Sequence, residues 1–356
     1  MRSKIPLVLL SALALISLAA ATPVSAQDGT PNYEPFREGI FLRYLNAHEG
    51  AGIDEIPRIG LSFGGRVHRA VIDSGSTGIV VAARMIPNFE ELPSLGEGRL
   101  TYSSSGRINI GKWVVTPVRL VGRNGEAVRT EPMPVLAVTQ VRCMPNARRC
   151  TPRDTPRNIA MVGVGFARER DHQAQSTPDK NPLLRVEGGG GERRRGYVLT
   201  AHGVHVGLTG ANTRGDFKFI KLARDPARSD WSPVPACISL NGQMPPACGT
   251  MLMDTGVSVM YITLPPAQTG SATGSLPPGT DVSIRVGPAE SSSELYRFKV
   301  NGGSPLAPQG THLRVSPTRV FVNTSYRFLN GFDLLYDADG GYVGFRARPI
   351  PVSAGR

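Results

Sequence analysis

The sequence predicts an all-β protein organised around two acidic motifs. Its 356 residues include 41 glycines and 30 prolines, and stretches with helical periodicity are scarce, a composition typical of many strands joined by turns. Apolar residues make up 40% of the chain, enough to form substantial cores. Two apolar runs each lead into an acid, a small hydroxyl residue and a glycine, at 71–78 and 251–258. Because one such motif is common in turns but two are not, we expect the acids to meet at a symmetric interface and act as a pair.

Residues 1–26 are predicted to be a signal peptide. Two basic residues, Arg2 and Lys4, precede an apolar run over 5–21, and Val-Ser-Ala at 24–26 fits a cleavage site. An uncleaved membrane anchor is the alternative, but the apolar run is short for a span, and no later stretch could cross a membrane. We therefore expect an exported protein, periplasmic or secreted, with no integral membrane segment once the signal is removed.

The net charge of +12 at pH 7 could favour an anionic surface, nucleic acid or acidic polymers. The basic residues are mostly arginines scattered along the chain. They lack the aromatic-interleaved stripe expected of a nucleic-acid reader. Diffuse cationic character is the preferred interpretation, and no nucleic-acid partner is expected.

The four cysteines form two close pairs, Cys143 with Cys150 and Cys237 with Cys248. In an exported protein this pattern indicates two local disulfides. A zinc site is the alternative, but neither pair has the spacing of a metal finger and no histidine lies near them. We expect no metal ion and no other cofactor.

Strands are predicted on both sides of each acid. In the first half, a Gly64-Gly65 turn joins two runs into a hairpin that delivers the first acid, and a second hairpin at 99–110 has an aromatic residue before its small, polar tip. Residues 167–196 are predicted to be a charged, flexible loop. The remaining predicted strands are 40–45, 79–83, 113–121, 133–141, 160–166, 197–200, 204–208, 217–222, 236–240 and 342–345, with a short helix or turn leading into a strand at 326–337.

In these motifs the chain resembles the pepsin-like aspartic proteases. Asp-Ser-Gly-Ser at 73–76 is similar to the first catalytic motif of that family, and Asp-Thr-Gly at 254–256 to the second. Tyr102 falls where the family carries its flap tyrosine. The apolar run 159–165, the turn and cysteine pair over 236–249 and the ending over 326–345 also resemble the family, so the similarity covers most of 40–348.

The resemblance implies a bilobal, all-β fold with two related lobes and the cleft between them. We expect a short N-terminal arm at 27–39, an N-terminal lobe at 40–196, a C-terminal lobe at 197–350 and a tail at 351–356. The substrate would be a peptide or an unfolded protein, and a monomer is expected.

Three positions depart from the family pattern. Val80 stands where a tryptophan usually supports the flap tyrosine, and Val257 replaces the Thr or Ser that supports the second acid. Ser325 falls near an expected glycine.

The resulting hypothesis is an aspartic endopeptidase in which Asp73 and Asp254 hold a water and share one proton, because two adjacent carboxylates do not easily ionise together. Gly75, Ser76, Thr255 and Gly256 are the residues expected to support this pair, with Ser76 orienting Asp73.

Tyr102 would close over the substrate. The departures motivate a second hypothesis, a catalytically weak or silent envelope protein that binds or inhibits without cutting. A cationic structural envelope protein is a third.

Overall fold

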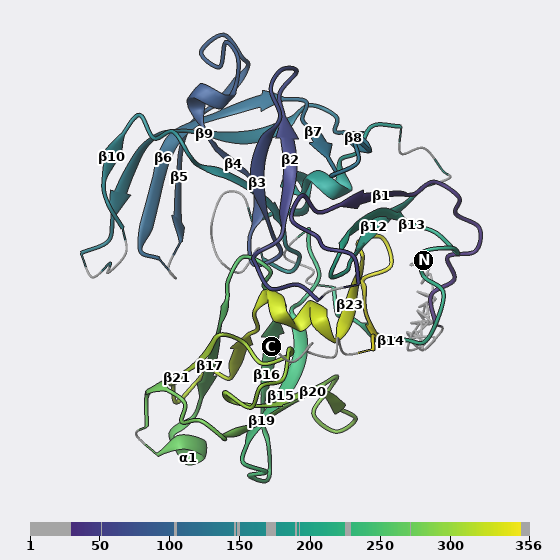
Figure 1. Cartoon of the computed structure of the whole chain (residues 1–356), viewed down its shortest axis with the longest axis vertical. Helices are drawn as coiled ribbons and strands as arrows, with labels where there is room; N and C mark the ends of the chain where they lie inside the picture. Colours follow the sequence, from purple (N-terminus) through teal and green to yellow (C-terminus); the bar gives the residue numbers. More distant parts are fainter. Residues whose placement is uncertain are drawn as a thin grey trace, which may run out of the picture. The chain divides into compact units, whose positions relative to one another are not determined.

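The computed structural model describes residues 30–50, 52–102, 105–145, 147, 150–168, 176–188, 191, 193–224, 229–270 and 272–349. The predicted signal peptide and the 351–356 tail lie outside these residues. Within them the chain is nearly all β, with a single four-residue α-helix, α1 (Pro266–Thr269), so the predicted fold class is confirmed. No described helix is long and apolar enough to span a membrane. The strands form three sheets within one compact unit, Pro31–Arg356 (Figure 1).

The first acid belongs to a ten-stranded sheet. Asp73 is the last residue of β3, which pairs antiparallel with β2 in the predicted hairpin. In order across the sheet, the strands are β5 (Ser94–Tyr102), β6 (Arg107–Thr116), β9 (Met133–Cys143), β4 (Thr77–Ala82), β11 (Ala160–Val164), β3 (His68–Asp73), β2 (Arg58–Ser62), β7 (Arg119–Val121) and β8 (Ala127–Arg129), with β10 (Arg153–Asp154) paired to β9.

The second acid follows a strand of an eight-stranded sheet. Asp254 lies two residues beyond the end of β16 (Ala247–Leu252), directly before a turn at Thr255 and Gly256. The strands in order are β18 (Gly274–Ser275), β21 (Gly310–Val315), β17 (Val259–Leu264), β22 (Phe321–Asn323), β16 (Ala247–Leu252), β15 (Val234–Leu240), β19 (Asp281–Val286) and β20 (Ser293–Lys299).

The same strand arrangement surrounds each acid. In the first sheet, β11 lies between β3 and β4, parallel to β3 and antiparallel to β4. In the second, β22 lies between β16 and β17, parallel to β16 and antiparallel to β17. Met161 pairs with the residue two before Asp73, and Asn323 with the residue two before Asp254, so these two side chains occupy equivalent positions.

The third sheet joins segments from the beginning, middle and end of the chain. Its six strands in order are β1 (Ile40–Arg43), β13 (Gly203–Leu208), β12 (Arg194–Leu199), β23 (Phe332–Asp337), β24 (Tyr342–Ala347) and β14 (Phe217–Lys221). A 3-10 helix, η5 (Tyr326–Asn330), leads into β23, as the sequence predicts. The predicted hairpin through 337–341 also forms, as β23 and β24.

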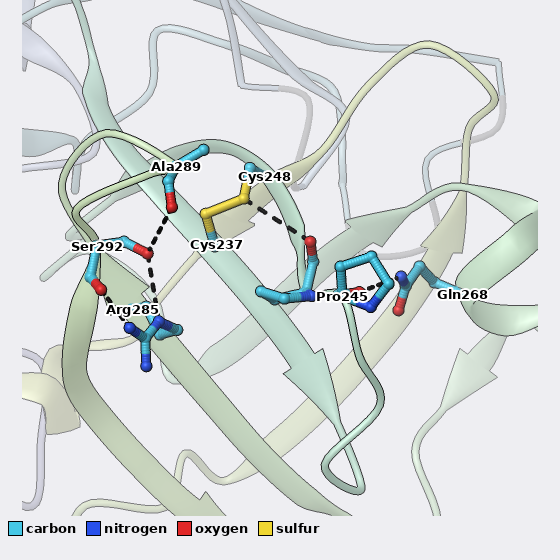
Figure 2. Close-up of a disulfide and its surroundings, with 8 residues drawn as sticks. Cys237, Pro245, Cys248, Gln268, Arg285, Ala289 and Ser292 are labelled. Atoms are coloured by element: carbon cyan, nitrogen blue, oxygen red, sulfur yellow. Dashed lines mark hydrogen bonds between the residues drawn. A yellow bond between two sulfur atoms is a disulfide. The ribbon is translucent and has the colours of Figure 1, made fainter.

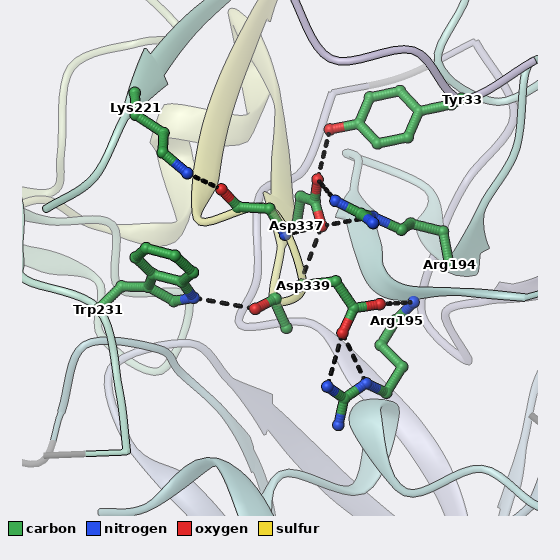
Figure 3. Close-up of polar contacts among 9 residues, drawn as sticks. Tyr33, Arg194, Arg195, Lys221, Trp231, Asp337 and Asp339 are labelled. Carbon is green, nitrogen blue, oxygen red and sulfur yellow. Dashed lines mark hydrogen bonds and ion pairs between the residues drawn. The ribbon is translucent and has the colours of Figure 1, made fainter. Parts of the chain in front are cut away.

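A buried carboxylate fixes this hairpin to β12 (Figure 3). The Asp337 side chain is 0% exposed and pairs with two nitrogens of the Arg194 guanidinium, both at 2.9 Å. The Tyr33 hydroxyl donates to Asp337 Oδ2 at 3.1 Å, and the backbone N–H groups of Asp339 and Gly340 donate to Oδ1. Because its hydrogen-bonding capacity is satisfied, Asp337 is a structural anchor of the turn.

Both predicted disulfides are present. Cys143, the last residue of β9, is bonded to Cys150. Cys237 and Cys248 lie directly opposite each other on β15 and β16 and are bonded across the strand pair (Figure 2). No described cysteine is free.

Two local predictions are wrong in detail. Part of the predicted loop at 167–196 is ordered as the 3-10 helices η3 (Pro178–Lys180) and η4 (Pro182–Leu184). The buried Asn181 between them donates to the carbonyls of Val164 and Gly165, which fixes this segment against the end of β11. The predicted strand at 113–121 divides into β6 and β7, because Pro117 has no N–H to continue the ladder.

Candidate active site

The two acids face each other across the interface between the two motifs. Asp73 and Asp254 are each only 6% exposed. A Cβ placed on Gly75 would collide with the Asp254 carboxyl group, and one on Gly256 would collide with that of Asp73. Each carboxyl therefore packs on the glycine of the opposite motif, an approach that only glycine permits. The pair predicted from sequence is brought together by the fold.

A reciprocal set of hydrogen bonds joins the two motifs below the acids. The Ser74 N–H donates to Thr255 Oγ1, and the Thr255 N–H donates to Ser74 Oγ, both at 3.0 Å. Each hydroxyl then donates onward across the interface, Ser74 to the Met253 carbonyl at 2.7 Å and Thr255 to the Ile72 carbonyl at 2.8 Å. Because all these groups are buried, this network fixes the relative position of the two acids.

Asp73 accepts two hydrogen bonds from its own motif. The Gly75 N–H donates to Oδ1 at 2.7 Å, and the Ser76 hydroxyl donates to Oδ2 at 2.6 Å. Ser76 thus lies in position to orient the first acid. Such short bonds to a carboxylate are the strong, charge-assisted kind.

Asp254 receives its second hydrogen bond from a different strand. The Gly256 N–H donates to Oδ1 at 2.9 Å, as in the first motif. Val257 offers no hydroxyl, but Asn323 Nδ2 donates to Oδ2 at 2.6 Å. Sequence reasoning missed Asn323 because it lies far along the chain. The only signal in the sequence was its place at the end of the short apolar run 320–322.

The pKa of Asp254 lies well above the ordinary range of an aspartate. Burial, followed by the charge of Asp73, raises the pKa of Asp254 to about 7. The hydrogen bonds from Asn323 and Gly256 act in the opposite direction because they stabilise the ionised form. Asp254 therefore holds a proton in mildly acidic solution while lying against a second carboxyl group.

Tyr102 lies at the end of β5, near the tip of the predicted flap hairpin. Its hydroxyl donates to Met161 Sδ at 3.0 Å, and burial raises its pKa, so the hydroxyl stays protonated. The ring packs against a buried cluster that includes Val80 and Trp113. Trp113, from β6, thus supplies an indole to the cluster, although the resemblance noted in the sequence leads us to expect a tryptophan at the position of Val80 instead.

A cavity of about 1290 Å³ opens over the acid pair. Residues from both acid-bearing sheets line it, including Tyr102 and Met161 on one side and Tyr261 and Phe321 on the other. Its size is sufficient for several residues of an extended peptide. Among the described residues, no group of three or more His, Cys, Asp or Glu side chains is arranged to hold a metal ion.

No protein-family model matches the chain, and no curated protein matches it either.

Proposed function

We propose that this protein is an aspartic endopeptidase that hydrolyses peptide bonds with a water activated by Asp73 and Asp254. The observation that carries the proposal is the pair of buried carboxyl groups at the floor of a large cavity, one with a pKa raised to about 7. A structural pair would gain nothing from holding two acids together out of water, since like charges at close range destabilise the fold. The resemblance of the two motifs to pepsin-like proteases supports the same conclusion.

In the proposed reaction, Asp73 acts as the base and Asp254 as the acid. Asp73 takes a proton from the water as its oxygen bonds to the substrate carbonyl carbon, and Asp254 gives its proton to the carbonyl oxygen. The tetrahedral intermediate then collapses: Asp73 gives the proton that it took from the water to the amide nitrogen, and the C–N bond breaks. Asp254 takes back a proton from a hydroxyl of the intermediate, which restores both acids. No covalent enzyme intermediate forms. Tyr102 closes over the bound segment and excludes water from it.

Export belongs to the same proposal. Two disulfides form and persist in oxidising compartments, which agrees with the predicted signal peptide. The substrate would be a peptide or an unfolded protein encountered in the periplasm or outside the cell.

Digestion of a denatured protein between pH 4 and 6 tests the proposal. We expect cleavage by the native enzyme, inhibition by a statine-type mimic of the tetrahedral intermediate, and loss of at least about 1000-fold in rate for Asp73→Asn and for Asp254→Asn. Asp216→Asn is the matched control, since Asp216 is exposed and lies outside the cavity. Undiminished digestion by the Asp73→Asn protein would overturn the proposal, and tight binding of the mimic without any turnover would favour a protein that binds without cutting.

A further inference from the structure

The wall of the active-site cavity carries a concentration of positive charge. Eight of the described residues that line it are arginines, whereas its only acids are Asp73 and Asp254 themselves. From this we propose, resting on the proposed function, that the cavity selects extended peptide segments carrying carboxylate side chains a few residues to either side of the cleaved bond.

Two of these arginines, Arg69 and Arg58, lie on β3, which ends at Asp73, and on its neighbour β2. Ala70 and Ile72 are fully buried in the core, so the alternating residues Arg69, Val71 and Asp73 share the opposite face of β3. Arg58 on β2 is directly opposite Val71. With a rise of about 3.3 Å per residue, Val71 lies about 7 Å and Arg69 about 13 Å along the strand from Asp73. These distances correspond to two and four residues of an extended substrate.

The flap hairpin adds positive charge above the acids. Arg107 is the cross-strand neighbour of Tyr102, the residue that contacts Met161 beside the first acid. Arg99 lies three residues before Tyr102 on the same strand and also lines the cavity.

The second sheet supplies a matching pair. Arg314 on β21 is opposite Thr263 on β17, which is in turn opposite Phe321 on β22. The Arg314 guanidinium lies 4.8 Å from the ring centre of Tyr261, and that of Arg319 lies 4.3 Å from the ring centre of Phe321. Both cations are therefore held on aromatic faces of the cavity wall. Arg319 lies four residues before Asn323, which contacts Asp254, and Arg314 lies two strands away at the level of Phe321.

Most of these arginines have no acidic partner within the described part of the chain. Seven of the eight, all except Arg168, have no Asp or Glu within 4.0 Å. Arginines elsewhere are commonly paired, as are Arg129 with Glu187 and Arg297 with Asp281. The cavity wall thus carries arginine charges that no acidic side chain of the described residues neutralises. The resulting positive electrostatic potential attracts anionic ligands.

One buried amide in the same cavity also lacks a partner. Asn109 on β6 is 0% exposed, and neither its Nδ2 nor its Oδ1 has a hydrogen-bond partner among the described residues. A buried polar group in this state is costly unless a ligand or water satisfies it. Its Nδ2 offers a donor to an entering carboxylate or carbonyl.

Apolar side chains also line the cavity within three residues of an acid or on the strand beside it. Val71, Met161, Leu252 and Val257 line the cavity beside the pair and are apolar. The expected substrate therefore has apolar residues at the cleaved bond and Asp or Glu farther out, rather than acids throughout.

The test compares three peptides of equal length that share the same apolar pair of residues at the centre. The peptides differ only in the residues that flank this pair, which are Glu, Gln or Lys. At pH 5.5 the Glu side chains are mostly ionised, because their pKa is about 4.3, while Asp254 still holds its proton. We expect kcat/KM to be about tenfold higher for the Glu peptide than for its Gln isostere, lowest for the Lys peptide, and the Glu preference to shrink as salt rises. The double variant Arg314→Gln/Arg319→Gln should lose most of the preference. Arg119→Gln, at an exposed arginine on β7 outside the cavity, should keep it.

Fluorescence anisotropy measures how tightly the Glu and Gln peptides bind to the Asp73→Asn protein. This measurement separates the proposed selectivity for acidic peptides from the proposed protease activity. Equal cleavage of the Glu and Gln peptides overturns the inference and leaves the protease intact. Tighter binding of the Glu peptide with no cleavage by the native protein supports the inference and refutes the protease. Equal binding of both peptides overturns the inference. Displacement of the Glu peptide by inorganic polyphosphate at equal charge concentration also overturns it, in favour of a ligand that is a non-peptide polyanion. Thermal unfolding of each arginine variant identifies any loss that comes from misfolding.

Discussion

The first half of the molecule supports its acid from within one turn, whereas the second half supports its acid from a neighbouring strand. Ser76 lies three residues after Asp73 and donates to it at 2.6 Å, while Val257 holds the same place after Asp254. Asn323 donates to Asp254 at 2.6 Å from β22, and the equivalent position on β11 holds Met161. The total number of donors is thus equal for the two acids, although their sources differ.

This comparison shows that a lost motif residue does not mean a lost interaction. The strand that passes beside each acid has one side chain within reach of the carboxyl, and in the second half that side chain is an amide. In the first half it is a thioether, which contacts Tyr102 and lies 3.6 Å from the Ser76 hydroxyl. The position that donates a hydrogen bond to the acid in one half therefore contacts Tyr102, the proposed flap residue, in the other.

The reciprocal bonds between Ser74 and Thr255 are the most symmetric part of the site, and we expect their removal to have the largest effect on stability. Ser74→Ala leaves the Thr255 N–H and the Met253 carbonyl without partners, and Thr255→Val leaves the Ser74 N–H and the Ile72 carbonyl. At about 1–3 kcal/mol for each buried unpaired group, each variant, which leaves two such groups, should lose about 2–6 kcal/mol of unfolding free energy. Urea denaturation measures this, and the double variant should lose less than the sum, since the two share bonds. Unequal single losses would show that the interface is not symmetric in energy.

Asn323→Leu tests the difference between the halves directly. It removes the one side-chain donor to Asp254, and a hydrogen bond to a charged group contributes about 1.5–3 kcal/mol. Because this bond favours the ionised form, its loss should raise the pKa of Asp254 further above about 7. Activity requires protonated Asp254 and should fall as pH rises through its pKa, so the alkaline limb of the kcat/KM profile should move to higher pH. The rate at the optimum should fall about 10- to 100-fold.

Met161→Leu, at the equivalent position of the first half, is the matched control. It should leave the alkaline limb unmoved and change the rate by less than about fivefold, because Met161 donates nothing to an acid. An unmoved alkaline limb in Asn323→Leu would mean that the amide does not tune the second acid.

Asn323 also marks how far the sequence could predict the site. The acids, Ser76 and the two glycines are recognisable because they act within one short motif, where spacing alone brings groups together. The reciprocal bonds of Ser74 and Thr255 need two motifs to meet. The contact between Asn323 and Asp254 depends on the register in which β22 pairs with β16, and no local sequence pattern specifies that register.

The same distinction applies to the fold. The hairpins at 58–73 and 332–347 are predictable, since turn residues join adjacent apolar runs. The six-stranded sheet was not, because it pairs Ile40–Arg43 with Gly203–Leu208 across most of the chain. The ordered segment 178–184 was missed because its charged composition suggests a loop, whereas the buried Asn181 satisfies backbone carbonyls that only the tertiary structure brings near.

The two disulfides offer a comparison of nearly equal loops in the two acid-bearing sheets. Their sequence separations are 7 and 11 residues, so removing either should lower the unfolding free energy by about 2–3 kcal/mol, slightly more for Cys237–Cys248. Thermal unfolding of the two double Cys→Ser variants measures this.

Activity should distinguish the two bridges. Cys143 is paired with Arg107, which is paired with Tyr102, so the first bridge constrains the flap hairpin. Its removal should raise KM by a few-fold, while removal of the second should leave KM unchanged at temperatures well below unfolding. A larger KM effect from the second bridge would contradict the assignment of β5 and β6 as a flap.

Val257→Thr would make the two halves more alike and should have the smallest effect. A threonine hydroxyl at 257 would lie where Ser76 lies relative to Asp73 and would give Asp254 a third hydrogen bond beside those from Gly256 and Asn323. Because the added bond favours the ionised carboxylate, the pKa of Asp254 should fall and the alkaline limb should move to lower pH by less than about one unit. In the Asn323→Leu background, the same substitution should return the alkaline limb toward its native position, since one donor then replaces the other. A Val257→Thr change that moves the alkaline limb in neither background would show that a hydroxyl at 257 does not reach Asp254 Oδ2, the oxygen to which Asn323 donates.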